Sequence, residues 1–230
     1  MTRLLPWGED LWIVDGPVVN FFGFRYPTRM AAIRLSGGKL FIWSPVRLDG
    51  ELKEEIDALG AVAHLVSPNK LHHLSLRQWK EAYPSAQLHA PPGLAKKRRD
   101  IRFDATLGNE APSDWAGEID QLCFGGSPAM AEIVFFHRKS RTALFCDLIE
   151  HLPRGWFTGW RGLVARLDGI VEPDFGAPRE WRMTFLDRKL ARLALGRILD
   201  WHPGQVVIAH GDGVRADGEA FIRRAFRWLA

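Results

Sequence analysis

The chain contains few cysteines and no long apolar run. Its two cysteines, Cys123 and Cys146, have no CxxC spacing, which excludes a disulfide scaffold and a cysteine-based zinc site. No segment approaches the run of about 18 apolar residues that a membrane-spanning helix needs. The chain reaches Glu9 and Asp10 before any apolar core region forms, which excludes a signal peptide. We therefore expect a cytoplasmic protein.

A strong charge of either sign is also absent. Lys and Arg number 31 against 27 Asp and Glu, which gives a net charge of +4. We interpret the basic run 96–99 as a solvated surface and expect no nucleic-acid partner, because no aromatic residues interleave its charges. The mild positive excess is compatible with an anionic substrate. Hydrophobic residues make up 47% of the chain and no compositional break divides it, so the sequence predicts one domain over residues 1–230.

The first residues have the pattern of β-strands. The apolar run 11–14 is expected to be a short strand that ends at Asp15-Gly16-Pro17. The segments 30–35 and 39–43 flank Ser36-Gly37-Gly38, and glycine in such a turn indicates a β-hairpin.

The hydrophobic period then changes to that of a helix. Asp49 can cap a helix that Gly60 ends, and the apolar run 61–66 follows directly. This order predicts a β-α-β unit with parallel strands. A second helix over about 76–83 and a short strand at 87–90 come next.

The second half repeats the alternation of strands and helices. The runs 133–137 and 142–146 predict a hairpin whose arms are buried on both faces. A helix over 187–200 precedes a last strand at 206–209, and an amphipathic helix ends the chain. The helix over 187–200 is expected to direct four residues inward: Leu190, Leu193, Ala194 and Ile198.

Four residues with metal-binding side chains follow these apolar runs. They are His72 and His73 in the loop after the second strand of the β-α-β unit, Asp147 after the hairpin, and His210 after the last strand. Imidazole and carboxylate groups are the ligands that zinc and similar ions take, at about 2 Å from the ion. We therefore predict a metal site where these strand ends meet.

The order of these parts resembles the metallo-β-lactamase superfamily. The loop 67–73 stands where that superfamily has its His-x-His-x-Asp-His motif, the hairpin ends at 145–148 with the Asp of a metal-bridging position, and the last strand ends at 208–211 with a ligand His. The resemblance implies an α/β fold, a four-layer αβ/βα sandwich with its site along one edge. The Pro-Asn-x-x-His-His loop further resembles an uncharacterised bacterial branch, defined as a domain of unknown function.

The departures from the superfamily pattern concern one of its two metal sites. Pro68 and Lys70 stand where the first two histidines are expected, and the third ligand position falls near Gly126 or Ser127, where no histidine is present. The resemblance therefore implies at most one metal ion.

The ligands of the other site are retained or replaced by a competent residue. The resemblance assigns His72, His73 and His210 as ligands, with Asp147 as ligand or general base. The ion expected is zinc, with iron or manganese as alternatives and no metal as the remaining one. Each histidine could instead be structural and donate to a backbone carbonyl.

Two functions remain open at this point. The first is a metal-dependent hydrolase of unknown, anionic substrate, in which Lys70 helps to hold the anion. The second is a catalytically inactive descendant that works as a binding or interaction protein, in which the polar residues form a hydrogen-bonded cluster. For Lys70 alone, simple exposure to solvent is the favoured interpretation. The oligomeric state is not predicted.

A segment rich in Trp, Gly and Pro covers residues 151–186. The favoured interpretation is that its tryptophans pack the insert onto the sandwich. The alternatives are a lid over the metal edge and contact with a membrane surface through 154–167, where arginines alternate with apolar residues.

Overall fold

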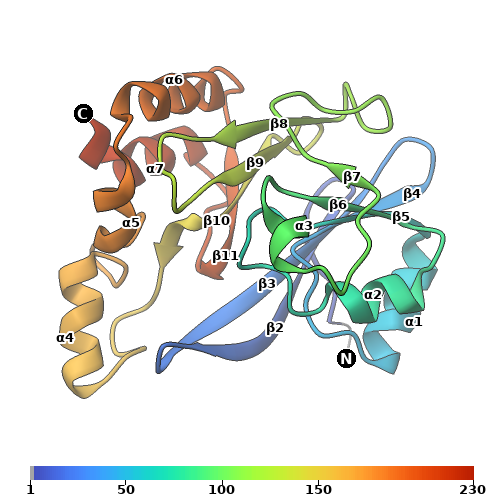
Figure 1. The fold of residues 1–230 in the computed structure, drawn as a ribbon, viewed down its shortest axis with the longest axis horizontal. Helices are drawn as coiled ribbons and strands as arrows, with labels where there is room; N and C mark the ends of the chain where they lie inside the picture. Colours follow the sequence, from blue (N-terminus) through green and yellow to red (C-terminus); the bar gives the residue numbers. More distant parts are fainter. Residues whose placement is uncertain (1–2) are drawn as a thin grey trace.

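Two β-sheets form the centre of the structure, a computed structural model that describes residues 3–230 (Figure 1). The first sheet has seven strands within this range, in spatial order β1 (Leu5–Gly8), β2 (Leu11–Phe21), β3 (Phe24–Arg34), β4 (Lys39–Trp43), β5 (Ala61–Val66), β6 (Gln87–Ala90) and β7 (Ala105–Thr106). The second sheet has four, in the order β11 (Gln205–Gly211), β10 (Thr142–His151), β9 (Glu132–His137) and β8 (Ile119–Phe124).

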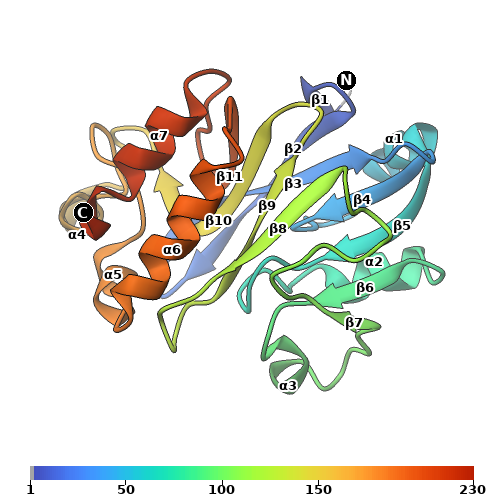
Figure 2. The ribbon, with the colours of Figure 1, turned by 90° about the horizontal axis from the view of Figure 1, so that it is seen from above.

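Helices cover the outer face of each sheet. The helices α1 (Gly50–Leu59) and α2 (Leu76–Ala82) pack on the first sheet, and α6 (Arg188–Leu199) and α7 (Gly218–Ala225) pack on the second. Figure 2 shows the resulting order of layers, from helices through two sheets to helices. This order confirms the predicted αβ/βα sandwich. The remaining helical segments are α3 (Leu94–Lys97), α4 (Gly159–Asp168), α5 (Arg179–Thr184) and the 3-10 turn Arg227–Leu229.

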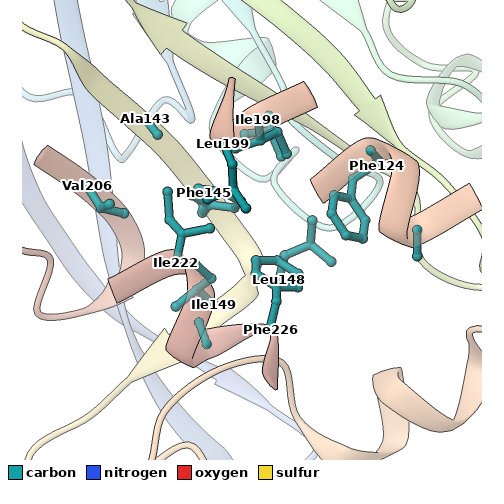
Figure 3. Packing of buried hydrophobic residues seen from close by; sticks show 14 of the residues in the cluster. Phe124, Ala143, Phe145, Leu148, Ile149, Ile198, Leu199, Val206, Ile222 and Phe226 are labelled. Atoms are coloured by element: carbon teal, nitrogen blue, oxygen red, sulfur yellow. The ribbon is translucent and has the colours of Figure 1, made fainter. Parts of the chain in front are cut away.

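Successive side chains of β10 point into two different hydrophobic cores. Leu144 and Cys146 point into the core between the sheets, while Ala143 and Phe145 point into the core under α6 and α7. Side chains alternate in this way because successive residues of a strand face opposite sides of the sheet. Figure 3 shows the outer core, in which Phe145 lies among residues of α6 and α7. Both arms of the hairpin are buried on both faces, as predicted.

The predicted β-α-β unit is present with its expected ends. The side chain of Asp49 accepts a hydrogen bond from the backbone N–H of Leu52 and so caps α1. Gly60 ends the helix at a φ of 155°, a conformation that L side chains rarely adopt. The strands β4 and β5 on either side of the helix pair in parallel.

The predicted end of the first long strand at Asp15-Gly16-Pro17 is wrong. The strand β2 continues to Phe21, and its pairing with β3 shifts register between Gly16 and Val19. Proline lacks a backbone N–H and is tolerated in a strand where a bulge interrupts the ladder. The bulge therefore lets the hairpin β2–β3 extend past Pro17.

Of the four residues predicted to point inward from the helix over 187–200, Ala194 and Ile198 are buried as predicted, and the other two are not. Leu190 and Leu193 are 47% and 60% exposed, while Ala191 and Ala194 are buried with Ile198. The helix lies close to Gly125 and Gly126 after β8, and this close approach requires small residues on its inner face.

A buried histidine pair in the first sheet makes the fold sensitive to acid. The Nδ1 atom of His64 lies 3.2 Å from Nε2 of His89. Both imidazole rings pack in a T-shaped arrangement against the ring of Trp115. Burial, together with the neighbouring His64, lowers the pKa of His89 to about 4. Between an unfolded pKa of about 6.5 and this value, the unfolded chain binds a proton that the folded chain does not, so stability falls as the pH falls.

We predict that His89→Gln reduces this acid sensitivity. Between pH 7.5 and pH 5, the His89 contribution lowers the free energy of unfolding of the wild type by about 2 kcal/mol, and the variant should lack this contribution. Urea denaturation at both pH values measures this difference. His202→Asn, at an exposed position, should keep the wild-type pH dependence. Equal losses in His89→Gln and the wild type would contradict the prediction.

Candidate metal centre

Asp147 lies where the ladder between β10 and β11 is interrupted. Phe145 pairs with Ile208 and Glu150 pairs with His210, so residues 146–149 stand opposite a single residue of β11. The chain bulges here, and the backbone N–H groups of the bulge lose their partners in the neighbouring strand. Buried N–H groups in this position need another acceptor.

Glu132, at the start of β9, is that acceptor. Its carboxylate accepts hydrogen bonds from the backbone N–H groups of Cys146 at 2.7 Å, Asp147 at 2.7 Å and Leu148 at 3.2 Å. The residue has no exposed surface. Burial and the nearby Asp147 carboxylate raise the pKa of Glu132 to about 8, against the opposing effect of the N–H donors. Glu132 therefore fixes the backbone that carries Asp147.

The bulge brings Asp147 to two histidines. Oδ1 of Asp147 lies 3.2 Å from Nε2 of His210, Oδ2 lies 3.6 Å from Nε2 of His72, and the two Nε2 atoms are 3.1 Å apart. One potential ligand atom from each residue falls within 4.8 Å of the others. The structure thus brings together three of the four predicted ligands, from the loop after β5, the bulge within β10 and the last residues of β11.

The Nδ1 atoms of His72 and His210 each lie within hydrogen-bond distance of another protein oxygen. Nδ1 of His210 lies 2.7 Å from the carbonyl oxygen of Pro27, which can only accept, so this nitrogen carries the hydrogen. Nδ1 of His72 lies 2.8 Å from Oγ of Ser44, the residue after β4. Both Nε2 atoms are therefore the ones directed at Asp147.

The charges within this cluster are coupled. Burial alone would lower the pKa of His210, but its hydrogen bond to Asp147 and the negative charges of Asp147 and Glu150 together outweigh burial and raise the pKa to about 9. Burial alone would raise the pKa of Asp147, and the imidazoles of His72 and His210 instead hold it well below its ordinary value. Burial lowers the pKa of His72. Without an ion, the cluster is an Asp147–His210 ion pair beside a neutral His72.

The same three residues fit a divalent metal ion. Two imidazole nitrogens and one carboxylate form a common ligand set for zinc or iron, with room for a further ligand. In such sites the second ring nitrogen of each histidine is bound to an oxygen of the protein, which orients the ring. Ser44 and Pro27 already supply these oxygens.

His73 does not join the three. Its Nδ1 atom lies 2.9 Å from Nη1 of Arg98, which also donates to the His73 carbonyl oxygen at 2.9 Å. The turn after Leu71 sends consecutive side chains in different directions, so His72 reaches the cluster and its neighbour cannot. The predicted set of four ligands is therefore corrected to three.

Lys70 also lies away from the cluster. It lines a small separate hollow beside Met130 and Trp181, and its carbonyl oxygen accepts a hydrogen bond from Nζ of Lys97 at 2.9 Å. Lys97, interpreted from the sequence as part of a solvated run, lines the cavity next to the cluster. The lysine that lines the cavity is thus Lys97 rather than Lys70.

Asn69 is a site residue that the sequence analysis missed. Its amide Nδ2 donates to the carboxylates of Asp147 and, at 3.1 Å, Glu132, while its Oδ1 accepts from the N–H groups of Leu71 and His72. It is 1% exposed. Its position between Pro68 and two histidines was visible in the sequence, but its partners lie 63 and 78 residues further along the chain.

A cavity of about 280 Å³ opens beside the cluster. Asp147, His72 and His210 line it together with Glu150, a second residue that the sequence analysis missed. Its walls are largely apolar, and its lining residues also include Pro17, Val19, Phe21, Tyr26, Val46, Arg47, Leu71, Leu74, Lys97, Glu180 and Trp181. The site therefore has space for a small organic molecule.

The missing ligand position near Gly126 is closed by packing. Gly126 has a φ of 104°, and a Cβ atom there would lie 2.5 Å from the carbonyl oxygen of Asp187 at the start of α6. Ser127 instead bonds Thr184 through its hydroxyl at 2.7 Å. A side chain at Gly126 would therefore require the start of α6 to move.

The insert 151–186 packs against the tip of the hairpin β2–β3 (Figure 1). Trp156 donates its indole N–H to the carbonyl oxygen of Arg25 at 2.7 Å, and Arg161 donates to that of Gly23 at 2.8 Å. Trp160 stays 60% exposed on α4. Among residues 3–230, no helix has the length and apolar character needed to cross a membrane.

Solved structures with the same fold are metallo-β-lactamases and flavodiiron proteins. DIM-1 metallo-β-lactamase exposed to ceftazidime is 18% identical, with a TM-score of 0.64 over 99% of this chain and 97% of that chain. A metallo-β-lactamase from Pontibacter korlensis is 11% identical, with a TM-score of 0.61 over 98% and 97%. The metal-soaked Flv1 flavodiiron core from Synechocystis sp. PCC6803 is 13% identical, with a TM-score of 0.65 over 99% and 60%. The chain thus has the metallo-β-lactamase fold.

Within this fold the sequence identifies a narrower group. A family profile described as "Domain of unknown function (DUF4336)" matches residues 9–157, and the chain belongs to this family. The matched segment includes His72 and Asp147, while His210 lies beyond it. No curated protein sequence matches the chain significantly.

We predict that Glu132→Ala destabilises the fold by at least about 3 kcal/mol. The substitution leaves three buried N–H groups without an acceptor, and each costs about 1–3 kcal/mol. Glu132→Gln keeps an amide oxygen that can still accept, so its loss should be smaller. Glu110→Ala, at an exposed position, should change stability by less than about 0.5 kcal/mol. Urea denaturation measures all three, and a Glu132→Ala loss as small as that of Glu110→Ala would refute the role assigned to Glu132.

Proposed function

We propose that this chain is a hydrolase that uses one divalent metal ion, held by His72, Asp147 and His210, with zinc as the expected ion. The observation that carries the proposal is the convergence of the two Nε2 atoms and the Asp147 carboxylate while both Nδ1 atoms are already bonded to protein oxygens. The adjoining cavity supports a small molecule as the substrate.

The residues of the chain supply orientation and charge. When bound, the ion would polarise a carbonyl or phosphoryl oxygen and make nearby water more acidic. Ser44 and Pro27 hold the two imidazoles in the orientation that directs Nε2 inward. Asn69 and the backbone fixed by Glu132 hold the carboxylate of Asp147.

Asp147 suits the role of ligand better than that of general base. Its pKa is held well below its ordinary value by the two imidazoles, although burial acts in the other direction. A carboxylate with so low a pKa binds a proton weakly and is a poor acceptor in proton transfer at neutral pH. Of the two roles left open for Asp147, the environment favours metal binding.

Lys97 is the residue that we expect to hold an anionic group of the substrate. It lines the cavity, and its Nζ atom is already positioned by the carbonyl oxygen of Lys70. Arg47 lines the same cavity from the loop after β4. A charge-assisted hydrogen bond from either residue would orient an anion at this side of the site.

The competing function is a metal-free binding protein. The observation that favours it is that the polar groups of the cluster already have partners within the protein. His210 pairs with Asp147, His72 lies within hydrogen-bond distance of His210, and Asn69 donates to Asp147. Such a cluster could stabilise the edge of the sandwich without an ion. Metal content separates the two functions.

We predict about one metal ion per wild-type chain when the protein is purified without a histidine tag. His72→Ala and His210→Ala should each lose the ion, because two remaining ligands bind it weakly. His73→Ala is the matched control and should keep it, since His73 points to Arg98. Plasma mass spectrometry measures all four proteins.

Two results would contradict this assignment. Wild type without metal, even after incubation with zinc, iron or manganese, favours the binding protein. Loss of metal in His73→Ala, with circular dichroism unchanged, would return His73 to the ligand set.

A second prediction concerns Lys97 in any metal-stimulated hydrolysis found in a screen of p-nitrophenyl esters and phosphodiesters. With an anionic substrate, Lys97→Ala should raise KM about tenfold and leave kcat nearly unchanged, because it removes a binding interaction of about 1.4 kcal/mol. Lys96→Ala, at an exposed position in the same helix that does not line the cavity, should behave as the wild type. An unchanged KM in Lys97→Ala would exclude Lys97 from anion binding.

A further inference from the structure

The buried residue Glu150 has one side-chain oxygen without a hydrogen-bond partner among residues 3–230. It is 3% exposed, and its Oε2 atom is buried and forms no hydrogen bond with any residue that the structure describes. The free-energy cost of burying a carboxylate is usually offset by a hydrogen-bond donor or an opposite charge. Here the carboxylate lines the cavity beside the metal cluster instead.

The backbone of Glu150 is fixed, so the position of its side chain is set by the fold. Its N–H donates to the carbonyl oxygen of Gly176 at 2.9 Å, and the N–H of Gly176 donates back to its carbonyl oxygen at 3.1 Å. It also stands opposite His210 in the β10–β11 ladder. The carboxylate therefore enters the cavity from a rigid strand, next to a ligand of the proposed ion.

The surroundings of Glu150 are acidic and aromatic. Glu180, from α5, lines the same cavity together with Asp147, and no lysine or arginine forms an ion pair with Glu150 in residues 3–230. The rings of Tyr26 and Trp181 also line the cavity, and Tyr26 meets the His210 ring edge-on at 5.6 Å. Carboxylates with aromatic rings beside them form a site for an organic cation.

The cations of the cavity come from other elements. Lys97 belongs to α3 and Arg47 to the loop after β4, whereas Glu150 and Glu180 belong to β10 and α5. The lining thus combines basic groups from the first half of the chain with acidic groups from the second. A molecule that carries both charges would match both sets of groups.

We propose that Glu150 is a specificity residue that binds a protonated amino group of the substrate, so that the substrate class is an amine or, with Lys97, a zwitterion. The inference rests on the proposed function for the place of this substrate beside the metal site. The amine supplies the hydrogen-bond donors that the described residues do not supply to Oε2 of Glu150. An ammonium–carboxylate pair in a buried site is among the stronger polar contacts of a protein.

The test compares three small aromatic probes of similar size on the metal-depleted 230-residue chain. These are 2-phenylethylammonium, the neutral 2-phenylethanol and the anionic 3-phenylpropionate, and binding is followed by NMR titration of the backbone amides. The Kd of the ammonium probe should be at least about tenfold lower than that of either other probe. Because the wild type alone gives this comparison, the test does not depend on a variant that folds.

Substitution then assigns the preference to Glu150. Glu150→Gln should raise the Kd of the ammonium probe at least about tenfold and leave that of 2-phenylethanol unchanged, while Glu110→Gln should change neither. Equal affinities for all three probes, tighter binding of 3-phenylpropionate, or an ammonium affinity unaffected by Glu150→Gln would overturn the proposal.

Failure of this proposal can be told apart from failure of the metal-dependent function. An ammonium preference in a chain that binds no metal would support the amine site and reject the hydrolase. One metal ion per chain without the ammonium preference would reject the amine site alone.

Discussion

The site depends on three consecutive backbone N–H groups that donate to one buried carboxylate. Glu132 accepts these hydrogen bonds where the pairing of β10 with β11 is interrupted. Without Glu132, the three buried N–H groups of the bulge would have no hydrogen-bond acceptor in the neighbouring strand. The bulge in turn places Asp147 within reach of His72 and His210. Asn69 joins the two parts, because it donates to both carboxylates and accepts from the loop that carries His72. A network of this kind is costly if any member is missing, and here the described partners complete it around Glu132.

The sequence predicted the layers of the fold because they follow from local patterns. The cap at Asp49 and the stop at Gly60 are interactions within a single helix, and the buried hairpin arms are continuous apolar runs. The errors occurred where distant packing decided the outcome. Pro17 is accommodated by a bulge against β3, and the inner face of α6 is set by its close approach to Gly126. In both cases the structure of the segment depends on residues that lie elsewhere in the sequence.

The candidate site was predictable to the extent that strand ends could be recognised. His72, Asp147 and His210 were found because each follows an apolar run, and the resemblance to the metallo-β-lactamase superfamily placed them in one site. The choice between two adjacent histidines depended on side-chain direction in a loop, and Arg98 settles that direction from another element. Glu150 could not be found by any local rule, because its significance is that Oε2 has no hydrogen-bond partner among the described residues of the folded chain.

The contact between Gly126 and the start of α6 also bears on how this chain can change over evolutionary time. A second metal centre would need new ligands at Pro68 and Lys70, and a third near Gly126, where a side chain would collide with the carbonyl oxygen of Asp187. Two of these changes are single replacements, but the third requires the helix to shift and the core beneath it to repack. Replacing ligands alone would therefore not supply a second centre, because a side chain at Gly126 also requires the start of α6 to move.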